Sequence, residues 1–372
     1  MQTEEPTGEL LAAPPHIGSY EPDDVTLLLS ELSADGLELP AAYREQLLRE
    51  GGHYAETLPI EYRPTERYEA LFEQLLAAHA ARIALLTRVL ARRVVREHSD
   101  EPVLVSLARA GTPVGVLLRR ALALEGVNAP HYTISIVRVR GLDARALQYL
   151  AERYAPQRLL FVDGWTGKGA IQTELEQALD AHAGEHGVRI RPRLAVLTDP
   201  GHVAELAASR EDELIPSACL NSTVSGLISR TVIRPDLLGA DAFHGVCVYD
   251  AFADRDVSRA YVDTISGRFD AVAGEVDGAL TRVAALAPAD GRGMREVQAV
   301  QQEWGIESVH HVKPGIGETT RVLLRRVPRC VLVNPQHSGD RLDHVLLLAQ
   351  ERGVPVRERP GAVYACFGLI EP

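Results

Sequence analysis

The stretch that decides the fold runs from residue 159 to residue 170 and reads Leu159-Leu160-Phe161-Val162-Asp163-Gly164-Trp165-Thr166-Gly167-Lys168-Gly169-Ala170. Its apolar first part predicts a buried strand that ends at Asp163, and a helix is expected from Ala170 to about His182. Between them, glycines let backbone N–H groups approach an anion, and the helix start adds positive potential. The Asp163 carboxylate can accept hydrogen bonds from ribose hydroxyls. Because the spacing is not that of a P-loop, the stretch predicts a phosphate-binding turn of another kind.

The same order of strand, loop and helix recurs on both sides of this stretch. A tight loop at 108–113 separates a strand from a helix at 114–124, and continuous apolar runs predict strands at 103–107, 132–139, 194–197 and 243–248. This alternation predicts an α/β fold with a doubly wound, mostly parallel sheet that is covered on both faces. Ligands bind at the carboxyl ends of the strands in such sheets, where we expect the loops at 108–112, 163–169 and 199–202.

Three parts are expected along the chain. Residues 1–62 form an N-terminal arm and helical extension, residues 63–286 form the α/β domain, and residues 294–372 form a small C-terminal domain. Helical spacing of apolar residues predicts one long helix from about residue 65 to residue 97. Proline, aspartate and glycine at 287–293 predict a linker between the two domains.

Composition excludes several classes of protein. The chain has 372 residues, a formal net charge of −12 and 46% apolar residues, which is typical of a globular protein and not of one that coats nucleic acid. The four cysteines and the histidines lack metal-ligand spacing, so neither a disulfide scaffold nor a zinc site is expected. With no signal peptide and no apolar run of 18 residues, the sequence predicts a cytoplasmic protein without a membrane partner.

Residues 161–170 resemble the loop that binds phosphoribosyl pyrophosphate (PRPP) in type I phosphoribosyltransferases. Asp163, Thr166 and Gly167 match that loop, whereas Gly164 stands where a second acidic residue is usual. Residues 106–112 resemble the pyrophosphate loop of the same family, and residues 138–143 resemble its cationic hood. The resemblance implies PRPP with Mg²⁺, the metal being held mainly by substrate phosphates. The ligand-binding residues that it implies are Ser106, Ala108, Arg109, Ala110, Gly111, Thr112, Asp163, Gly164, Thr166, Gly167, Lys168 and Gly169, and the catalytic ones are Asp163, Arg109, Arg138 and Arg140.

The C-terminal part carries a second resemblance. Residues 313–322, Lys-Pro-Gly-Ile-Gly-Glu-Thr-Thr-Arg-Val, resemble the Gly-x-x-Glu-x-x-Arg/Lys signature of Pelota-like domains, which bind kink-turn RNA. This implies a small αβα domain in which phosphate contacts provide affinity and base contacts near Glu318 provide specificity. A degenerate domain that serves other interactions is the alternative. The RNA-binding residues that the resemblance implies are Lys313, Gly315, Gly317, Glu318, Thr319 and Arg321.

Taken together, the chain is similar to a bacterial family of phosphoribosyltransferase-like proteins with a Pelota-like tail, found in tellurium-resistance and stress gene clusters. The main prediction is therefore a phosphoribosyltransferase, a glycosyltransferase that uses PRPP and Mg²⁺ to make or transfer a nucleoside-like group. A non-enzymatic RNA-binding module that senses a nucleotide is another prediction. The sequence leaves the acceptor, the RNA and the oligomeric state open.

The same family also carries the label of cysteine protease, which makes Cys219 a candidate nucleophile. A thiol near a helix start has a lowered pKa, and His244 or His53 is expected to serve as its base if the fold brings either within reach. The alternative is that Cys219 is a small buried apolar residue.

Overall fold

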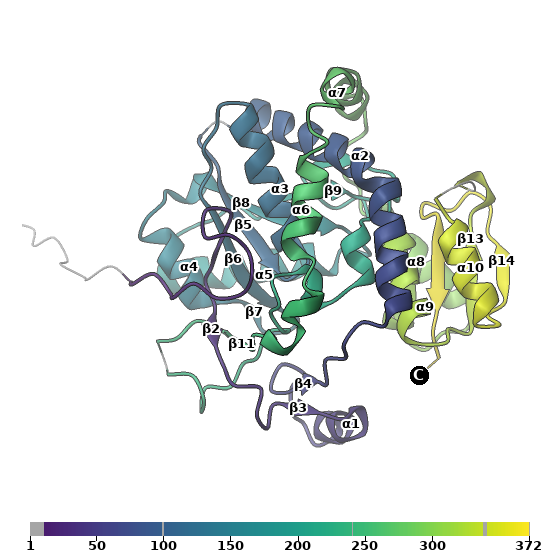
Figure 1. Ribbon diagram of the computed structural model, residues 1–372, viewed down its shortest axis with the longest axis horizontal. Coiled ribbons are helices and arrows are strands. Elements are labelled where there is room, and N and C mark those ends of the chain that lie inside the picture. The colour runs from purple at the N-terminus through teal and green to yellow at the C-terminus, as the bar shows by residue number, and fades with distance from the viewer. Residues whose placement is uncertain (1–10, 99, 240, 338–340, 372) are drawn as a thin grey trace, which may run out of the picture.

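The computed structural model describes residues 11–98, 100–239, 241–337 and 341–371. Its central sheet consists of β1 (Thr26–Leu27), β5 (Val103–Ala108), β6 (His131–Val137), β7 (Gly141–Leu142), β8 (Leu159–Trp165), β9 (Leu194–Thr198) and β10 (Leu206–Ser209). The strand order is β1-β6-β5-β8-β9-β10, with β7 paired to β6. Figure 1 labels the central strands β6, β5, β8 and β9 of this sheet. Every pair along that order is parallel, and only the β6–β7 pair is antiparallel. The predicted α/β fold with a mostly parallel central sheet is confirmed.

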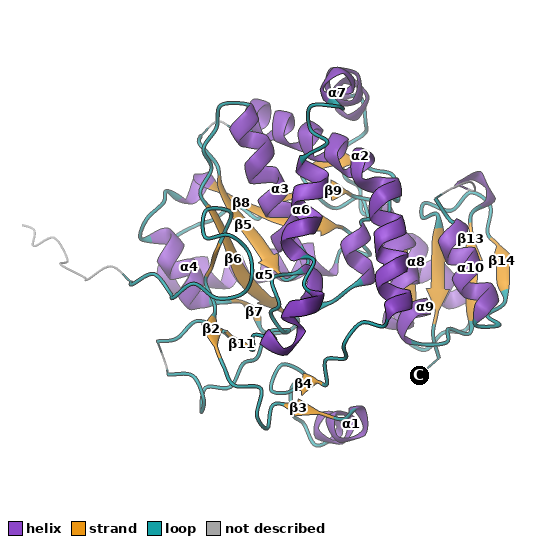
Figure 2. Cartoon of the chain, viewed as in Figure 1, coloured by secondary structure: helices purple, strands orange, loops and turns teal. Residues whose placement is uncertain are grey.

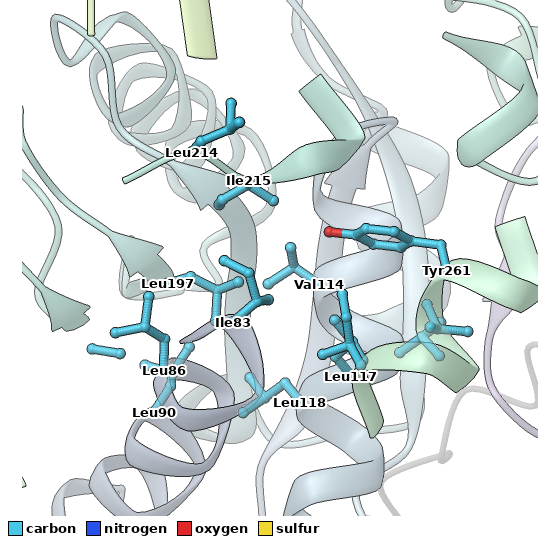
Figure 3. Close-up of a cluster of buried hydrophobic side chains, with 14 of the residues drawn as sticks. Ile83, Leu86, Leu90, Val114, Leu117, Leu118, Leu197, Leu214, Ile215 and Tyr261 are labelled. Carbon is cyan, nitrogen blue, oxygen red and sulfur yellow. The ribbon is translucent and has the colours of Figure 1, made fainter. Parts of the chain in front are cut away.

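Helices cover both faces of this sheet because successive residues of its strands point to opposite faces and both sets are apolar. In β8, Leu160 and Val162 belong to one buried cluster, whereas Leu159 and Phe161 belong to the other. The first face is covered by α2 (Glu66–Glu97), α3 (Gly111–Leu124), α6 (Ser258–Ser266) and α7 (Val276–Ala284), and the second by α4 (Ala144–Ala151) and α5 (Ala170–His186). Figure 3 shows the first cluster, in which Ile83 of α2 lies near Val114 of α3. Each such buried side chain stabilises the fold by about 1.5–3 kcal/mol.

Helix α2 fulfils the prediction of one long helix. By length and composition it is also the one helix among the described residues that would suit a membrane span, and 61% of its most apolar window is buried inside the protein. Its inner side chains, such as Leu86 and Leu90, are buried against the domain core. This burial is that of a core helix.

The N-terminal part differs from the expected helical extension. It contains one helix, α1 (Ala41–Arg49), and its strand β1 pairs with β6 at the edge of the central sheet. Two small parallel pairs complete it, β2 (Ser30–Glu31) with β11 (Gly245–Val246) and β3 (Glu38–Leu39) with β4 (Leu58–Pro59) (Figure 2). The two-residue strands are too short to show a period in the sequence, so only pairing with distant segments makes them strands.

The small C-terminal domain stands beside α2 at one end of the sheet (Figure 1). Its elements are α8 (Arg292–Glu303), β12 (Val312–Pro314), α9 (Ile316–Arg325), β13 (Cys330–Val333), α10 (Asp343–Glu351), β14 (Val356–Glu358) and β15 (Cys366–Leu369), with sheet order β12-β15-β13-β14. Short 3₁₀ turns occur throughout the chain, at η1 (Pro156–Arg158), η2 (Pro216–Cys219), η3 (Ser222–Val224), η4 (Asp250–Arg255), η5 (Ala273–Glu275), η6 (Val309–His311) and η7 (Pro335–His337).

Candidate functional site

Two neighbouring clefts lie between the carboxyl ends of β5, β6 and β8 and the C-terminal domain. The domain cleft has a volume of about 550 Å³ and the loop cleft about 250 Å³. The residues that line both are Ala108, Arg109, Ile136, Arg138, Lys313, Glu318 and Arg321. Residues predicted for two separate functions, one in each domain, therefore share one pair of clefts.

The loop at 163–169 borders the loop cleft, but much of its polar chemistry is used within the protein. The Thr166 hydroxyl donates to the buried Asp199 carboxylate and accepts from Gly201 N–H at 3.1 Å. Lys168 is buried, and its Nζ donates to the carbonyl oxygens of Val309 at 2.5 Å and Val312 at 3.5 Å. Both predicted phosphate ligands thus hold this loop to its neighbours.

The loop after β5 divides its residues between the cleft and the core. Ala108 and Arg109 line both clefts, and Arg109 Nη1 donates to the Ile228 carbonyl at 2.9 Å. Ser106 Oγ lies 2.8 Å from His131 Nε2 and donates to the Gly111 carbonyl at 3.1 Å, and neither Ser106 nor Thr112 is exposed. The hydroxyls predicted to bind ligand at these two positions therefore face the core.

The predicted hood is anchored at several points. Arg138 is exposed and lines both clefts, while its backbone N–H donates to Tyr54 Oη at 2.8 Å. Glu174 accepts from the N–H groups of Val139 and Gly141 at 3.0 and 3.2 Å. Arg140 is exposed and lines neither cleft. Of the two predicted arginines, only Arg138 is placed to meet a ligand there.

Asp163 lies at the floor of the loop cleft, where its Oδ1 accepts from Gly164 N–H at 2.7 Å. Burial raises the pKa of Asp163 to about 7, against the opposing effects of that hydrogen bond and of Arg321. Glu318, on the facing helix, raises this pKa further. The side chain that was predicted to hold a ribose is therefore about half protonated near neutral pH.

Replacing Asp163 by asparagine gives a test of this titration. Because the folded-state pKa lies above the unfolded value of about 3.9, the stabilisation from the bound proton is lost as the pH rises towards 7. The neutral Asp163→Asn variant should therefore gain about 2 kcal/mol of unfolding free energy relative to the parent between about pH 5 and about pH 8. Urea denaturation of both proteins at each pH measures this difference, and a difference that does not change with pH would contradict it.

The signature segment of the C-terminal domain is partly buried against the α/β domain. The carboxylate of Asp212, which is 3% exposed, accepts from Ile316 N–H at 3.0 Å and from Ala365 N–H at 3.0 Å. Gly315, with φ of +87°, leaves room for that carboxylate because an added Cβ would lie 3.1 Å from its Oδ1. Asp212 therefore caps the start of α9 from another domain.

Two further signature residues are also covered. An added Cβ on Gly317 would lie 3.3 Å from the Trp165 ring, and Thr319 is fully buried. Lys313, Glu318 and Arg321 instead line the clefts. In this arrangement RNA has no access to Gly315, Gly317 or Thr319.

Cys219 lies at the end of η2 and is 5% exposed. Burial raises the pKa of its thiol to about 12, although Arg321 and Arg325 act in the opposite direction. His244 Nδ1 is hydrogen-bonded to the Ser135 hydroxyl, and His53 Nε2 lies 3.2 Å from the Arg138 carbonyl. Neither histidine is hydrogen-bonded to Cys219, so the structure does not bring together the predicted nucleophile and either predicted base.

Comparison with known proteins decides the family. The profile described as "Tellurite-like stress resistance cysteine protease StiP" matches residues 18–266, and the profile of the PELOTA RNA binding domain matches residues 291–372. The protein named "Cysteine protease StiP" from Acinetobacter baylyi is 36% identical over 341 residues, covering 89% of this chain and 88% of that protein. The chain belongs to the StiP family.

Membership of the StiP family corrects the main functional prediction. The family description and the A. baylyi relative both name a cysteine protease, which contradicts phosphoribosyl transfer from PRPP and supports the alternative prediction. Among solved structures, a hypoxanthine phosphoribosyltransferase from Trypanosoma cruzi in complex with IMP aligns with a TM-score of 0.26 and 15% identity, over 47% of this chain and 92% of that chain. A likeness at this score carries no argument about activity.

Several residues that shape the clefts have no recognisable signal in the sequence. Asp212 has no motif around it, and its partner Ile316 is distant in the chain. Arg230 and Arg325 line the domain cleft from segments without a recognisable pattern. Within the described part of the chain, no group of three or more His, Cys, Asp or Glu side chains is arranged to hold a metal ion. The Mg²⁺ prediction, which placed the metal on substrate phosphates, is not tested by that observation.

Proposed function

We propose that this chain is a cysteine protease of stress resistance and that Cys219 is its nucleophile. The family description and the A. baylyi relative support protease activity. In this chemistry a thiolate attacks the peptide carbonyl, the amine leaves with a proton, and water hydrolyses the resulting thioester. The cytoplasmic location remains a prediction, as does the binding of structured RNA by the C-terminal domain.

The position of Cys219 is the observation that carries this assignment. Its turn, η2, borders a small hollow lined in part by Ser217, Asn221 and Arg321. The other three cysteines are buried elsewhere, Cys247 in a cluster with Leu37 and Leu58, and Cys330 and Cys366 in strands of the C-terminal domain. Among the four cysteines, Cys219 is thus the one whose chain neighbours, Ala218 and Leu220, line a hollow near the domain boundary, while its own side chain packs in the core of the α/β domain.

Burial keeps the Cys219 thiol protonated in this structure, so this arrangement is a resting one. Helix α9 covers η2, and Arg325 Nη2 donates to Asn221 Oδ1 at 2.6 Å across this contact. A shift of α9 would admit water to the sulfur and remove most of the burial effect. Arg321 and Arg325 would then act on a hydrated thiol, and nearby cations lower the pKa of a thiol and increase its thiolate fraction.

Alkylation tests the assignment directly. The protein is treated with iodoacetamide for increasing times, and casein hydrolysis and the modification of each cysteine are measured on the same samples. We expect activity to fall in proportion to the modification of Cys219. Full modification of Cys219 with activity intact, or a loss that follows another cysteine, would overturn the proposal.

A further inference from the structure

The domain cleft carries a concentration of positive charge that proteolysis does not require. Seven of its lining residues are lysine or arginine and one is glutamate, in a chain whose formal net charge is −12. The α/β domain contributes Arg109, Arg138 and Arg230, and the C-terminal domain contributes Lys313, Arg321, Arg325 and Arg326. Cations from two domains thus face one space.

Most of this charge is not neutralised by the protein. Arg230 and Arg326 have no ion pair within 4.0 Å with any residue that the structure describes, and Arg325 donates to a neutral amide. Arg109 donates to a carbonyl, and its nearest carboxylate, on Glu61, is 3.9 Å away. Like charges at short range repel. This cluster of arginine and lysine side chains is therefore stable only if solvent or a bound anion compensates its charge.

The pKa values of two of these side chains are lowered first by burial and then by this repulsion. Burial, followed by the charges of Arg109 and Arg321, lowers the pKa of Arg230 to about 10. Burial and then Arg321, Arg109 and Arg230 lower the pKa of Arg325 to about 9. The two guanidinium groups thus act on each other across the domain boundary, although both remain accessible from the cleft.

We propose that the domain cleft binds a compact phosphate ligand with several negative charges, of the size of a nucleoside di- or triphosphate, and that both domains hold it. A volume of about 550 Å³ falls in the range of about 300–1,000 Å³ that is typical of small-molecule sites. Guanidinium groups bind phosphate oxygens in a two-pronged geometry, and Tyr54, which lines the cleft, offers a ring for an attached base.

A small ligand fits the site better than an RNA strand does. The glycines of the signature that would approach a phosphodiester backbone are covered by Asp212 and Trp165. Helix α9 presents Glu318, Arg321, Val322 and Arg325 to the cleft. An RNA strand would first require the two domains to separate, whereas a small anion can reach these arginines in the docked form.

The experiment measures binding of inorganic tripolyphosphate by calorimetry, without added Mg²⁺ and at low ionic strength. Arg230→Ala should raise the dissociation constant about tenfold or more. Arg325→Ala should have a similar effect, because each substitution removes a charge-assisted contact. Arg329→Ala is the matched control, since Arg329 is exposed on the same C-terminal domain outside the cleft, and it should bind like the parent. Without ligand, Arg230→Ala should melt no earlier than the parent, because it removes a repelling charge.

Two results would overturn the proposal. In the first, Arg230→Ala and Arg325→Ala bind tripolyphosphate as the parent does. In the second, an RNA oligonucleotide with hydroxyl ends binds more tightly than tripolyphosphate and the same two substitutions abolish its binding, which would make the cleft an RNA site. The test is separate from that of protease activity, since Cys219→Ser should leave tripolyphosphate binding unchanged.

Discussion

Replacing Cys219 by serine is expected to lower casein hydrolysis by about 10³-fold or more, because loss of the nucleophile removes the covalent step and leaves only the contribution of substrate binding. The substitution changes one atom of a buried side chain, so its unfolding free energy should stay within about 2 kcal/mol of the parent. Activity is measured as the initial rate of casein hydrolysis, with stability measured on the same preparation.

Cys330→Ser is the matched control for this prediction. Cys330 is also buried, in β13 of the C-terminal domain, where its thiol lies 3.5 Å from the Val331 carbonyl and none of its chain neighbours lines a cleft. The control should keep the activity of the parent. If Cys219→Ser also keeps it, or if both variants lose it equally, then Cys219 is not the nucleophile.

Replacing Asp212 by alanine should release the start of α9 from the α/β domain. The two N–H groups that Asp212 accepts from, on Ile316 and Ala365, would lose their partner inside a buried interface. Burial raises the pKa of Asp212 to about 7, so its carboxyl group accepts these hydrogen bonds in part as the neutral acid. Leaving two buried N–H donors without an acceptor costs about 3 kcal/mol, so amides of α9 should exchange with deuterium about 100-fold faster. Exchange is measured by mass spectrometry on the full chain.

Glu211→Ala is the control for Asp212→Ala. Glu211 also reaches the C-terminal domain, through an ion pair with Arg341 at 2.7 Å, but its side chain is 54% exposed. Exposed ion pairs contribute about 1 kcal/mol or less, so α9 should exchange nearly as in the parent. In Asp212→Ala, Cys219 should also react faster with iodoacetamide, because α9 covers η2. Equal exchange of α9 in both variants would show that the cap does not hold the domains together.

The fold followed from local patterns, because the longer strands β5, β6, β8 and β9 each carry enough apolar residues to be recognised alone, whereas the two-residue strands β1 and β7 do not. The loops at 108–112 and 163–169 were placed at the carboxyl edge for the same reason, and both border the clefts. What the sequence did not show depends on docking of the two domains. Lys168 was predicted to bind phosphate, yet it donates to carbonyls of the C-terminal domain, and such a contact leaves no local pattern.

The interpretation of Cys219 shows the same limit. Its place before a predicted helix suggested a lowered pKa, but η2 is a single 3₁₀ turn and α9 covers it. The histidines expected as bases are held by partners near β6 and β7 instead. Sequence identified a candidate nucleophile, whereas its burial and the lack of a histidine partner follow from packing between segments about a hundred residues apart.

The cap on α9 also affects whether the C-terminal domain can be transferred alone from one protein to another. A helix normally carries its own N-terminal cap, so a domain can move between proteins as a self-contained piece. Here Gly315 precedes α9 and offers no side chain, and the acceptor comes from Asp212 in the other domain. A gene fragment that encodes only residues 291–372 would therefore specify a helix whose first N–H groups lack a side-chain acceptor. In another protein, the transferred domain would need a new acceptor from the rest of that protein.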